Sequence, residues 1–163
     1  MKKIIVIPII VFASLLFASP QPRQEKEDIA YPYQYRGWTH VKSAVVGPTS
    51  PASPKYEGFT HIYANEAAMS GYRTGNFPDG SVIVFEVLQT VTKAGVLEEG
   101  QRKFIDVMMK DQSRYNETGG WGFAEFAKDS TTVQVLTAPD KQACFNCHNS
   151  RKQQGYVFSS YRQ

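Results

Sequence analysis

The sequence predicts an α+β fold, mainly an antiparallel β-sheet with short helices, one of them near the C-terminus. Segments rich in Val, Ile and aromatic residues follow one another at short spacings, separated by Gly-, Pro- and Asn-containing turns. Helical patterns are confined to residues 65–72 and about 140–150. A chain of 163 residues in which 42% are hydrophobic allows a single domain of this class.

The first expected strand covers residues 59–64. Its alternation places on one face the side chains of Phe59, His61 and Tyr63. Asn65 comes next and can cap the short helix at 65–72, because an Asn side chain accepts hydrogen bonds from the first free backbone amides.

The clearest strand covers residues 81–91 and is apolar on both faces except for Glu86, so we expect it to be central in the sheet. Glu86 is expected to form a structural ion pair with Arg73 or Arg102. Two further strands, which complete an antiparallel meander, are expected at 101–109 and 121–127.

The N-terminus predicts an exported protein. Lys2 and Lys3 precede an apolar run of about 14 residues, and small residues follow it, as in a secretory signal peptide over residues 1–19. The run is shorter than the roughly 20 residues that span a bilayer, and no later run is long enough for a stable membrane span. We therefore expect a periplasmic protein with a flexible leader at 20–36 and one folded domain at 37–163.

The charge of the chain argues against nucleic acid as a partner. The net charge is +3, from 18 basic and 15 acidic residues. Without Lys2 and Lys3, 16 basic residues remain against 15 acidic ones, a net charge of +1. A nucleic-acid binder of this size normally carries a strongly basic surface.

The chemistry is concentrated in Cys144-Phe145-Asn146-Cys147-His148, a C-x-x-C-H motif typical of one covalently attached haem c. Two thiols three positions apart lie within about one helical turn, so both can reach the same porphyrin, and His148 can supply an axial nitrogen to its iron. Asp140 is expected to cap this haem-attachment helix.

Two other functions of the cysteine pair stay open at this point. A redox-active dithiol would be expected in a βαβ setting near the N-terminus. A structural zinc site needs two more ligands, which His40 and His61 would have to supply. The export signal favours haem, because C-x-x-C-H motifs receive their haem outside the inner membrane.

The sixth iron ligand decides between an electron carrier and a protein with an open ligand position. The candidate ligands in the sequence are His40, His61, Met69, Met108 and Met109. Small electron-transfer cytochromes are mainly helical, with the motif near the start of the mature chain. A motif near the C-terminus of a strand-rich chain argues against an ordinary carrier.

The chain resembles the cytochrome P-460 family, which includes cytochrome c′-beta. The resemblance extends over most of residues 35–161. It is carried by Tyr35-Arg36-Gly37-Trp38, by the segments 61–67 and 74–86, by Trp121-Gly122-Phe123, by the C-x-x-C-H motif and by Tyr156-Val157-Phe158. It implies an antiparallel β fold, a periplasmic haem c, a homodimer and an iron with an open distal side. Enzymatic members oxidise hydroxylamine, whereas cytochrome c′-beta members bind nitric oxide and carbon monoxide.

Three departures from the enzymatic pattern place this chain nearer to the cytochrome c′-beta type. Phe85 occupies the position of the lysine that enzymatic members bond to the haem rim. Phe59 and Thr60 lie where those members carry a basic residue. Some members carry a distal carboxylate a little upstream of the haem motif, and the only acid in that stretch here is Asp140.

We therefore expect an apolar distal pocket shaped by Phe85, with Phe59 or Thr60 nearby. Such a pocket favours nitric oxide or a similar small gas as the ligand. The alternatives are an oxidoreductase acting on hydroxylamine or a related nitrogen compound, and an electron-transfer cytochrome c. A periplasmic redox partner is also expected.

Overall fold

The computed structural model describes residues 29–162. The expected signal peptide at 1–19 and the first part of the expected leader lie outside the described residues. Among residues 29–162, no helix is both long and apolar enough to cross a membrane.

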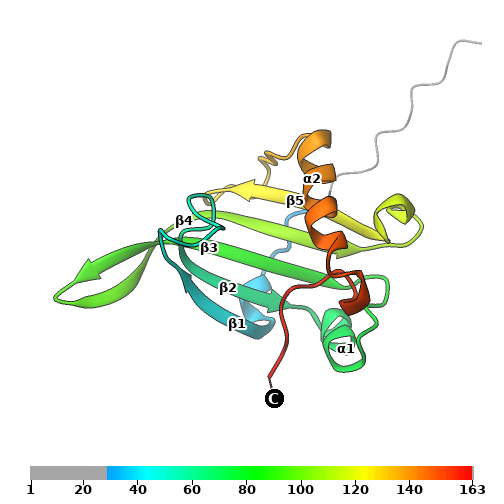
Figure 1. Ribbon diagram of the computed structural model, residues 1–163, viewed down its shortest axis with the longest axis horizontal. Helices are drawn as coiled ribbons and strands as arrows, with labels where there is room; N and C mark the ends of the chain where they lie inside the picture. Colours follow the sequence, from blue (N-terminus) through cyan, green and yellow to red (C-terminus); the bar gives the residue numbers. More distant parts are fainter. Residues whose placement is uncertain (1–28, 163) are drawn as a thin grey trace, which may run out of the picture.

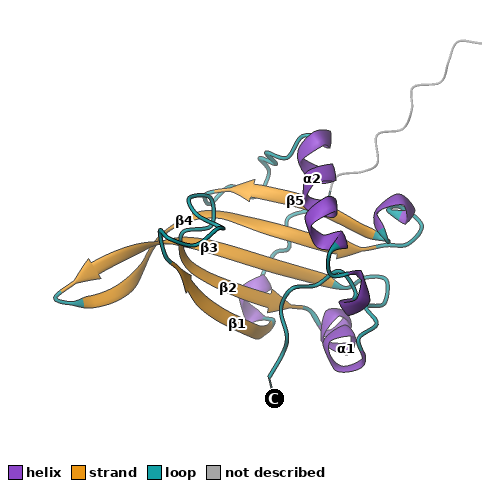
Figure 2. Ribbon diagram, in the orientation of Figure 1, coloured by secondary structure: helices purple, strands orange, loops and turns teal. Residues whose placement is uncertain are grey.

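The core of the fold is one five-stranded antiparallel sheet in which strand order follows chain order (Figures 1 and 2). The strands are β1 (Thr39–Val46), β2 (Gly58–Ala64), β3 (Val82–Lys93), β4 (Val96–Lys110) and β5 (Trp121–Ala127). Helix α1 (Glu66–Thr74) connects β2 to β3, and helix α2 (Ala138–Asn149) follows β5. Three short 3₁₀ turns are η1 (Tyr35–Gly37), η2 (Asn116–Thr118) and η3 (Lys152–Gln154). The α+β expectation is confirmed.

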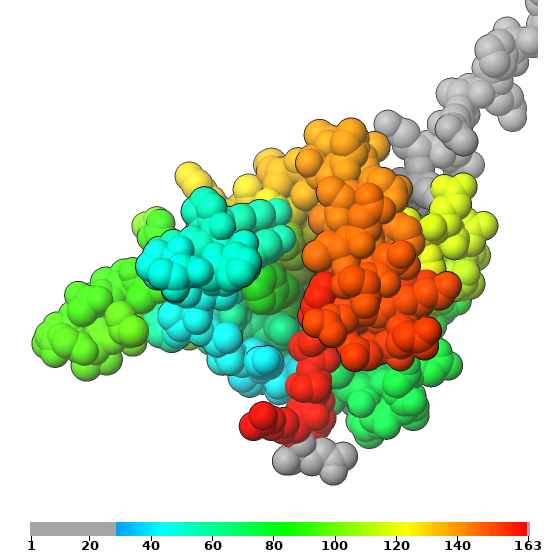
Figure 3. All heavy atoms as spheres, viewed as in Figure 1, coloured from blue at the N-terminus to red at the C-terminus, as the bar shows by residue number. Residues whose placement is uncertain are grey.

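The local signals in the sequence explain the ends of α1. The Asn65 side chain accepts a hydrogen bond from the Ala68 amide, and Gly75 ends the helix in the left-handed region at φ 79°. Strand β1 was not predicted, because five of its eight residues are exposed and its pattern is mostly polar. Strand β4 begins earlier than the expected 101–109. Residues 89–101 of β3 and β4 form a two-stranded arm that projects beyond the rest of the sheet (Figures 1 and 3).

The two faces of the sheet carry different partners. One face, which we call the helix face, packs against α1, α2 and the C-terminal segment, and its core contains Ile83, Met108 and Phe123. The opposite face carries Val84, Ile105, Val107, Ala124 and Phe126 and is covered by the segment that begins at Ile29.

The part of the expected flexible leader that is described, residues 29–36, is packed onto the sheet. Ile29 and Tyr35 are buried, and the ring of Tyr31 meets that of Phe126 edge-on at 5.2 Å between centroids. The folded domain therefore begins no later than Ile29, and the expected boundary at residue 37 is too late. The sequence gives little sign of this, because the segment is short and carries two polar residues, Gln34 and Arg36, and a proline among its apolar and aromatic residues.

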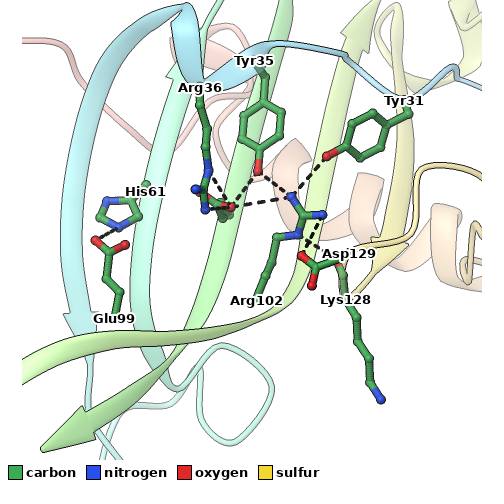
Figure 4. A network of polar contacts seen from close by, with 9 residues as sticks. Tyr31, Tyr35, Arg36, His61, Glu99, Arg102, Lys128 and Asp129 are labelled. Carbon is green, nitrogen blue, oxygen red and sulfur yellow. Dashed lines mark hydrogen bonds and ion pairs between the residues drawn. The ribbon is translucent and has the colours of Figure 1, made fainter.

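Glu86 is fully buried on this opposite face and binds the N-terminal segment (Figure 4). The Tyr35 hydroxyl donates to Glu86 Oε1 at 2.6 Å, and Arg36 Nη2 lies 2.6 Å from the same oxygen. Arg102 Nη1 lies 3.8 Å away, so the expected pairing with Arg102 is found, whereas Arg73 pairs with Glu66 instead. Burial and the hydrogen bond to Glu86 raise the pKa of Tyr35, which keeps this phenol protonated as a donor.

Removal of the Arg36 side chain is expected to destabilise the fold, because Glu86 would keep its buried charge with fewer partners. We expect Arg36→Ala to lower the free energy of unfolding by about 1–3 kcal/mol. The matched control is Arg73→Ala, which breaks the exposed pair with Glu66 at 3.0 Å and should cost less than about 1 kcal/mol. Denaturant unfolding of the two variants measures the difference, and equal losses would contradict this role of Glu86.

Candidate haem site

A capping box at its N-terminus fixes where helix α2 begins. Thr137 is the N-cap, and its hydroxyl accepts from the Asp140 amide while the Asp140 carboxylate accepts from the Thr137 amide at 2.9 Å. Asp140 is thus the third residue of the helix and not the cap that we expected. The sequence allows both assignments, and Pro139 within the first turn fits the earlier start.

The three motif residues of α2 line one cavity of about 400 Å³ between this helix, the sheet and the C-terminal segment. The wall on the sheet side is formed mainly by apolar residues of β2, β3, β4 and β5, among them Ile62, Ile83, Phe85, Met108 and Phe123. Leu136, Val157 and Phe158 add apolar surface from the segments on either side of α2. The cavity therefore combines two thiols, one imidazole and a large apolar wall.

The imidazole of His148 is held in one tautomer. Its Nδ1 lies 2.7 Å from the carbonyl oxygen of Tyr156, which can only accept, so Nδ1 carries the proton and Nε2 keeps its lone pair. Metal-binding histidines are commonly oriented by such a bond to a backbone carbonyl. The ring lies between those of Phe123 and Phe158, at centroid distances of 5.4 Å and 5.0 Å. Burial lowers the pKa of His148 and favours the neutral, ligating form.

These residues fit a haem c. Cys144 and Cys147 are free thiols, and both line the cavity together with His148. None of the residues of α2 is fully buried, although Cys144 and Phe145 pack against the core of the helix face. A planar apolar group between α2 and the sheet would contact the thiols, the imidazole and the apolar wall at once.

The zinc alternative is not supported. Within residues 29–162, no cluster of three or more His, Cys, Asp and Glu side chains has the arrangement to hold a metal ion. His61 lies next to Glu86 across β2 and β3 and belongs to the opposite face of the sheet. Its ring lies 5.9 Å from that of His40, so both histidines are remote from the thiols in the fold.

Of the three residues expected to shape the distal side, Phe85 lines the cavity, whereas Phe59 and Thr60 do not. Phe59 is three positions from Ile62 along β2, so it lies on the opposite face of the sheet from this cavity residue. Thr60 shares a face with Ile62 but is buried, and its hydroxyl donates to the Ala44 carbonyl at 3.2 Å.

Of the five candidate sixth ligands, Met108 alone lines the cavity. His40 and His61 lie on the opposite face, as just described. Met69 is buried on α1 within the core of the helix face, and Met109 packs on the opposite face.

The cavity is not purely apolar, because Asp106 also lines it. Asp106 on β4 pairs across the sheet with Glu125 on β5, which brings the two carboxyl groups together. Lys55, from the loop between β1 and β2, places its Nζ 2.6 Å from Glu125 Oε2. The next residue, Tyr56, lines the cavity and packs edge-on against Phe85 at 5.6 Å between ring centroids.

These contacts act on the charge state of Asp106. Burial and the neighbouring charge of Glu125 raise the pKa of Asp106 well above its ordinary value, although Lys55 acts in the other direction. Burial opposes the charge on Lys55, but its contact with Glu125 raises its pKa overall. Asp106 thus favours its neutral acid form beside a lysine-bound carboxylate.

Sequence reasoning missed this pair. Asp106 alternates along β4 with the apolar Ile105 and Val107, a pattern typical of a strand with one polar, solvent-facing side. The strand register places Asp106 beside Phe85, and this neighbour is the signal that could have identified it.

The pKa shift of Asp106 predicts a pH-dependent stability. Because the folded pKa is raised, the unfolded chain releases this proton more easily, so stability falls as pH rises through the folded pKa. Asp106→Asn removes this loss. The variant should gain stability relative to the natural chain at about pH 7.5 and gain little near pH 4.5. Denaturant midpoints at the two pH values test this, with the exposed Glu117→Gln as control, and a gain that does not change with pH would contradict it.

Comparison with known families agrees with this site. The family model for Cytochrome P460 matches residues 32–159, which include every strand, both helices and the C-x-x-C-H motif. A search of individual curated proteins gives no significant match. The matched segment contains the cavity and the residues that fit a haem, so the chain belongs to the cytochrome P-460 family and is a haem protein of the c type.

Proposed function

We propose that this protein carries one haem c, bound covalently through Cys144 and Cys147, and binds nitric oxide or a similar small gas in the periplasm. The observation that supports this most strongly is the single cavity that contains both the motif residues and an apolar wall centred on Phe85. When bound, the haem supplies an iron ligated by His148 that takes small diatomic ligands.

The wall residues select for small neutral ligands. Phe85, Met108 and Phe123 offer no hydrogen-bond donors, so an anion beside this part of the wall would lose water without replacement partners. Nitric oxide and carbon monoxide are nearly apolar and need few polar contacts. Phe85 occupies the position of the family's cross-linking lysine, which supports a closer similarity of this chain to the cytochrome c′-beta type than to the enzymatic members. We extend the homodimeric assembly of that type to this chain.

Phe85 is expected to restrict entry of the gas. We expect Phe85→Ala to raise the association rate constant for nitric oxide by about tenfold, which corresponds to a barrier lower by roughly 1.4 kcal/mol. The matched control is Phe59→Ala on the neighbouring strand, which removes the same ring from the opposite face and should leave the rate unchanged. Stopped-flow mixing of the reduced protein with nitric oxide measures both, and equal rates in the three proteins would contradict the proposal.

A second candidate function is oxidation of hydroxylamine or a related nitrogen compound. The observation that favours it is the pair of Asp106 and Glu125, which supplies acid–base groups at the cavity that sequence reasoning did not find. A neutral acid beside a lysine-bound carboxylate can both donate and accept a proton within a few ångströms. The absence of the lysine at the position of Phe85 still argues against this activity.

Replacement of Asp106 separates the two functions. If the protein oxidises hydroxylamine, Asp106→Asn should lower its turnover about 100-fold or more, since a positioned acid–base group contributes that much. Association of nitric oxide should change by less than about threefold, because Asn has nearly the size of Asp. Full retention of turnover in the variant would exclude Asp106 as the proton donor.

An electron-transfer role requires a sixth protein ligand and a redox partner in the periplasm. Met108 is the candidate that the cavity wall supports, since the other four lie elsewhere. The absorption spectrum of Met108→Leu tests this role. The spectrum should change if Met108 is an axial ligand, because the thioether is lost, and should stay the same if Met108 is only part of the cavity wall.

A further inference from the structure

The face of the sheet opposite the haem cavity carries a chain of short contacts between four side chains: His40, Ser43, His61 and Glu99. Ser43 Oγ lies 2.6 Å from His61 Nδ1, and His61 Nε2 lies 2.7 Å from Glu99 Oε1 (Figure 4 shows the second contact). On the other side of Ser43, its Oγ lies 2.8 Å from His40 Nε2. None of these residues contributes to the functions proposed above.

When Glu99 is ionised and both histidines are neutral, the donors and acceptors that each group has fix which atom donates in every one of these hydrogen bonds. A carboxylate can only accept, so His61 Nε2 donates to Glu99, and His61 Nδ1 is left as an acceptor. Ser43 therefore donates its only proton to His61, and His40 Nε2 must donate to Ser43 Oγ. The serine hydroxyl thus directs its proton toward a base and keeps one lone pair besides the one that accepts from His40.

An irregularity in β1 places His40 and Ser43 on the same face of the sheet. His40 and Ser43 are three positions apart and would lie on opposite faces of a regular strand. The register between β1 and β2 shifts between His40 and Lys42, which places both side chains on the face of His61. Such bulges re-aim side chains and are frequent near functional sites.

We propose that Ser43, His61 and Glu99 form an acyl-transfer site for esters of small carboxylic acids. Ser43 is the nucleophile, His61 the general base, and Glu99 a positioning residue that holds the imidazole. The N–H of His40, which donates to Ser43 Oγ in the free protein, would turn to the carbonyl oxygen of the ester once Ser43 Oγ has bonded to the carbonyl carbon. Ser43 and His40 are exposed, so a dissolved ester reaches both.

The reaction is balanced without a further reagent. Ser43 Oγ bonds to the carbonyl carbon of the ester, the bond from that carbon to the alcohol oxygen breaks, and His61 passes the serine proton to the departing oxygen. Water then attacks the acyl-serine with His61 as base, which releases the carboxylic acid and restores Ser43. The sum is ester plus water giving acid plus alcohol.

The test uses the haem-loaded protein with p-nitrophenyl acetate and with a fluorophosphonate probe. We expect nitrophenolate release above the rate in buffer, and a probe adduct on the peptide that contains Ser43. Ser43→Ala should abolish both, and His61→Gln should slow both about 100-fold. The control is Ser113→Ala, since the Ser113 hydroxyl contacts Asp111 and no histidine.

Three results would overturn the proposal: ester hydrolysis unchanged in Ser43→Ala, probe adducts spread over several serines, or equal labelling in His61→Gln. The positioning role of Glu99 predicts that Glu99→Gln slows labelling and that Glu99→Asp restores part of the rate. The haem absorption of each variant should match that of the natural chain, so a failure here leaves the gas-binding proposal untouched.

Discussion

The architecture depends on one constraint, which is that a single sheet needs a cover on both faces. On one face the N-terminal segment packs from Ile29 onward and is bound by the buried carboxylate of Glu86. On the other face α2 and the C-terminal segment complete the cover while leaving a cavity of about 400 Å³. The hydrogen bond from His148 to the Tyr156 carbonyl joins these two elements and aims the remaining ring nitrogen.

The cavity wall has an apolar part and an acidic part, and together they decide which chemistry a bound haem can support. Most of the wall is apolar and includes the aromatic rings of Phe85, Phe123 and Tyr56, a surface that disfavours charged ligands because they would lose water there. Asp106 adds one acidic group whose neutral form is favoured by burial and by the lysine-bound Glu125 beside it. The proposed gas binding uses the apolar part of the wall, whereas oxidation of hydroxylamine would need the acidic part.

Local patterns in the sequence predicted much of the fold and the motif residues that line the cavity. The C-x-x-C-H motif acts within one helical turn, and the caps at Asn65 and Gly75 act within a few residues, so both can be found by inspection. The neighbours of Asp106 could not be found in this way. They depend on the register of three strands and on a loop that brings Lys55 to Glu125. The N-terminal segment was missed for the same reason, since Ile29 and Tyr35 are buried by partners that are distant in the sequence.

The most direct measurement is an anaerobic absorption spectrum of the purified protein, reduced with dithionite and then exposed to nitric oxide. We expect a broad high-spin spectrum at the usual position of haem c, which changes at once when the gas is added. A sharp low-spin spectrum that is indifferent to nitric oxide would contradict this expectation, because a sixth side chain would then occupy the position proposed for the gas.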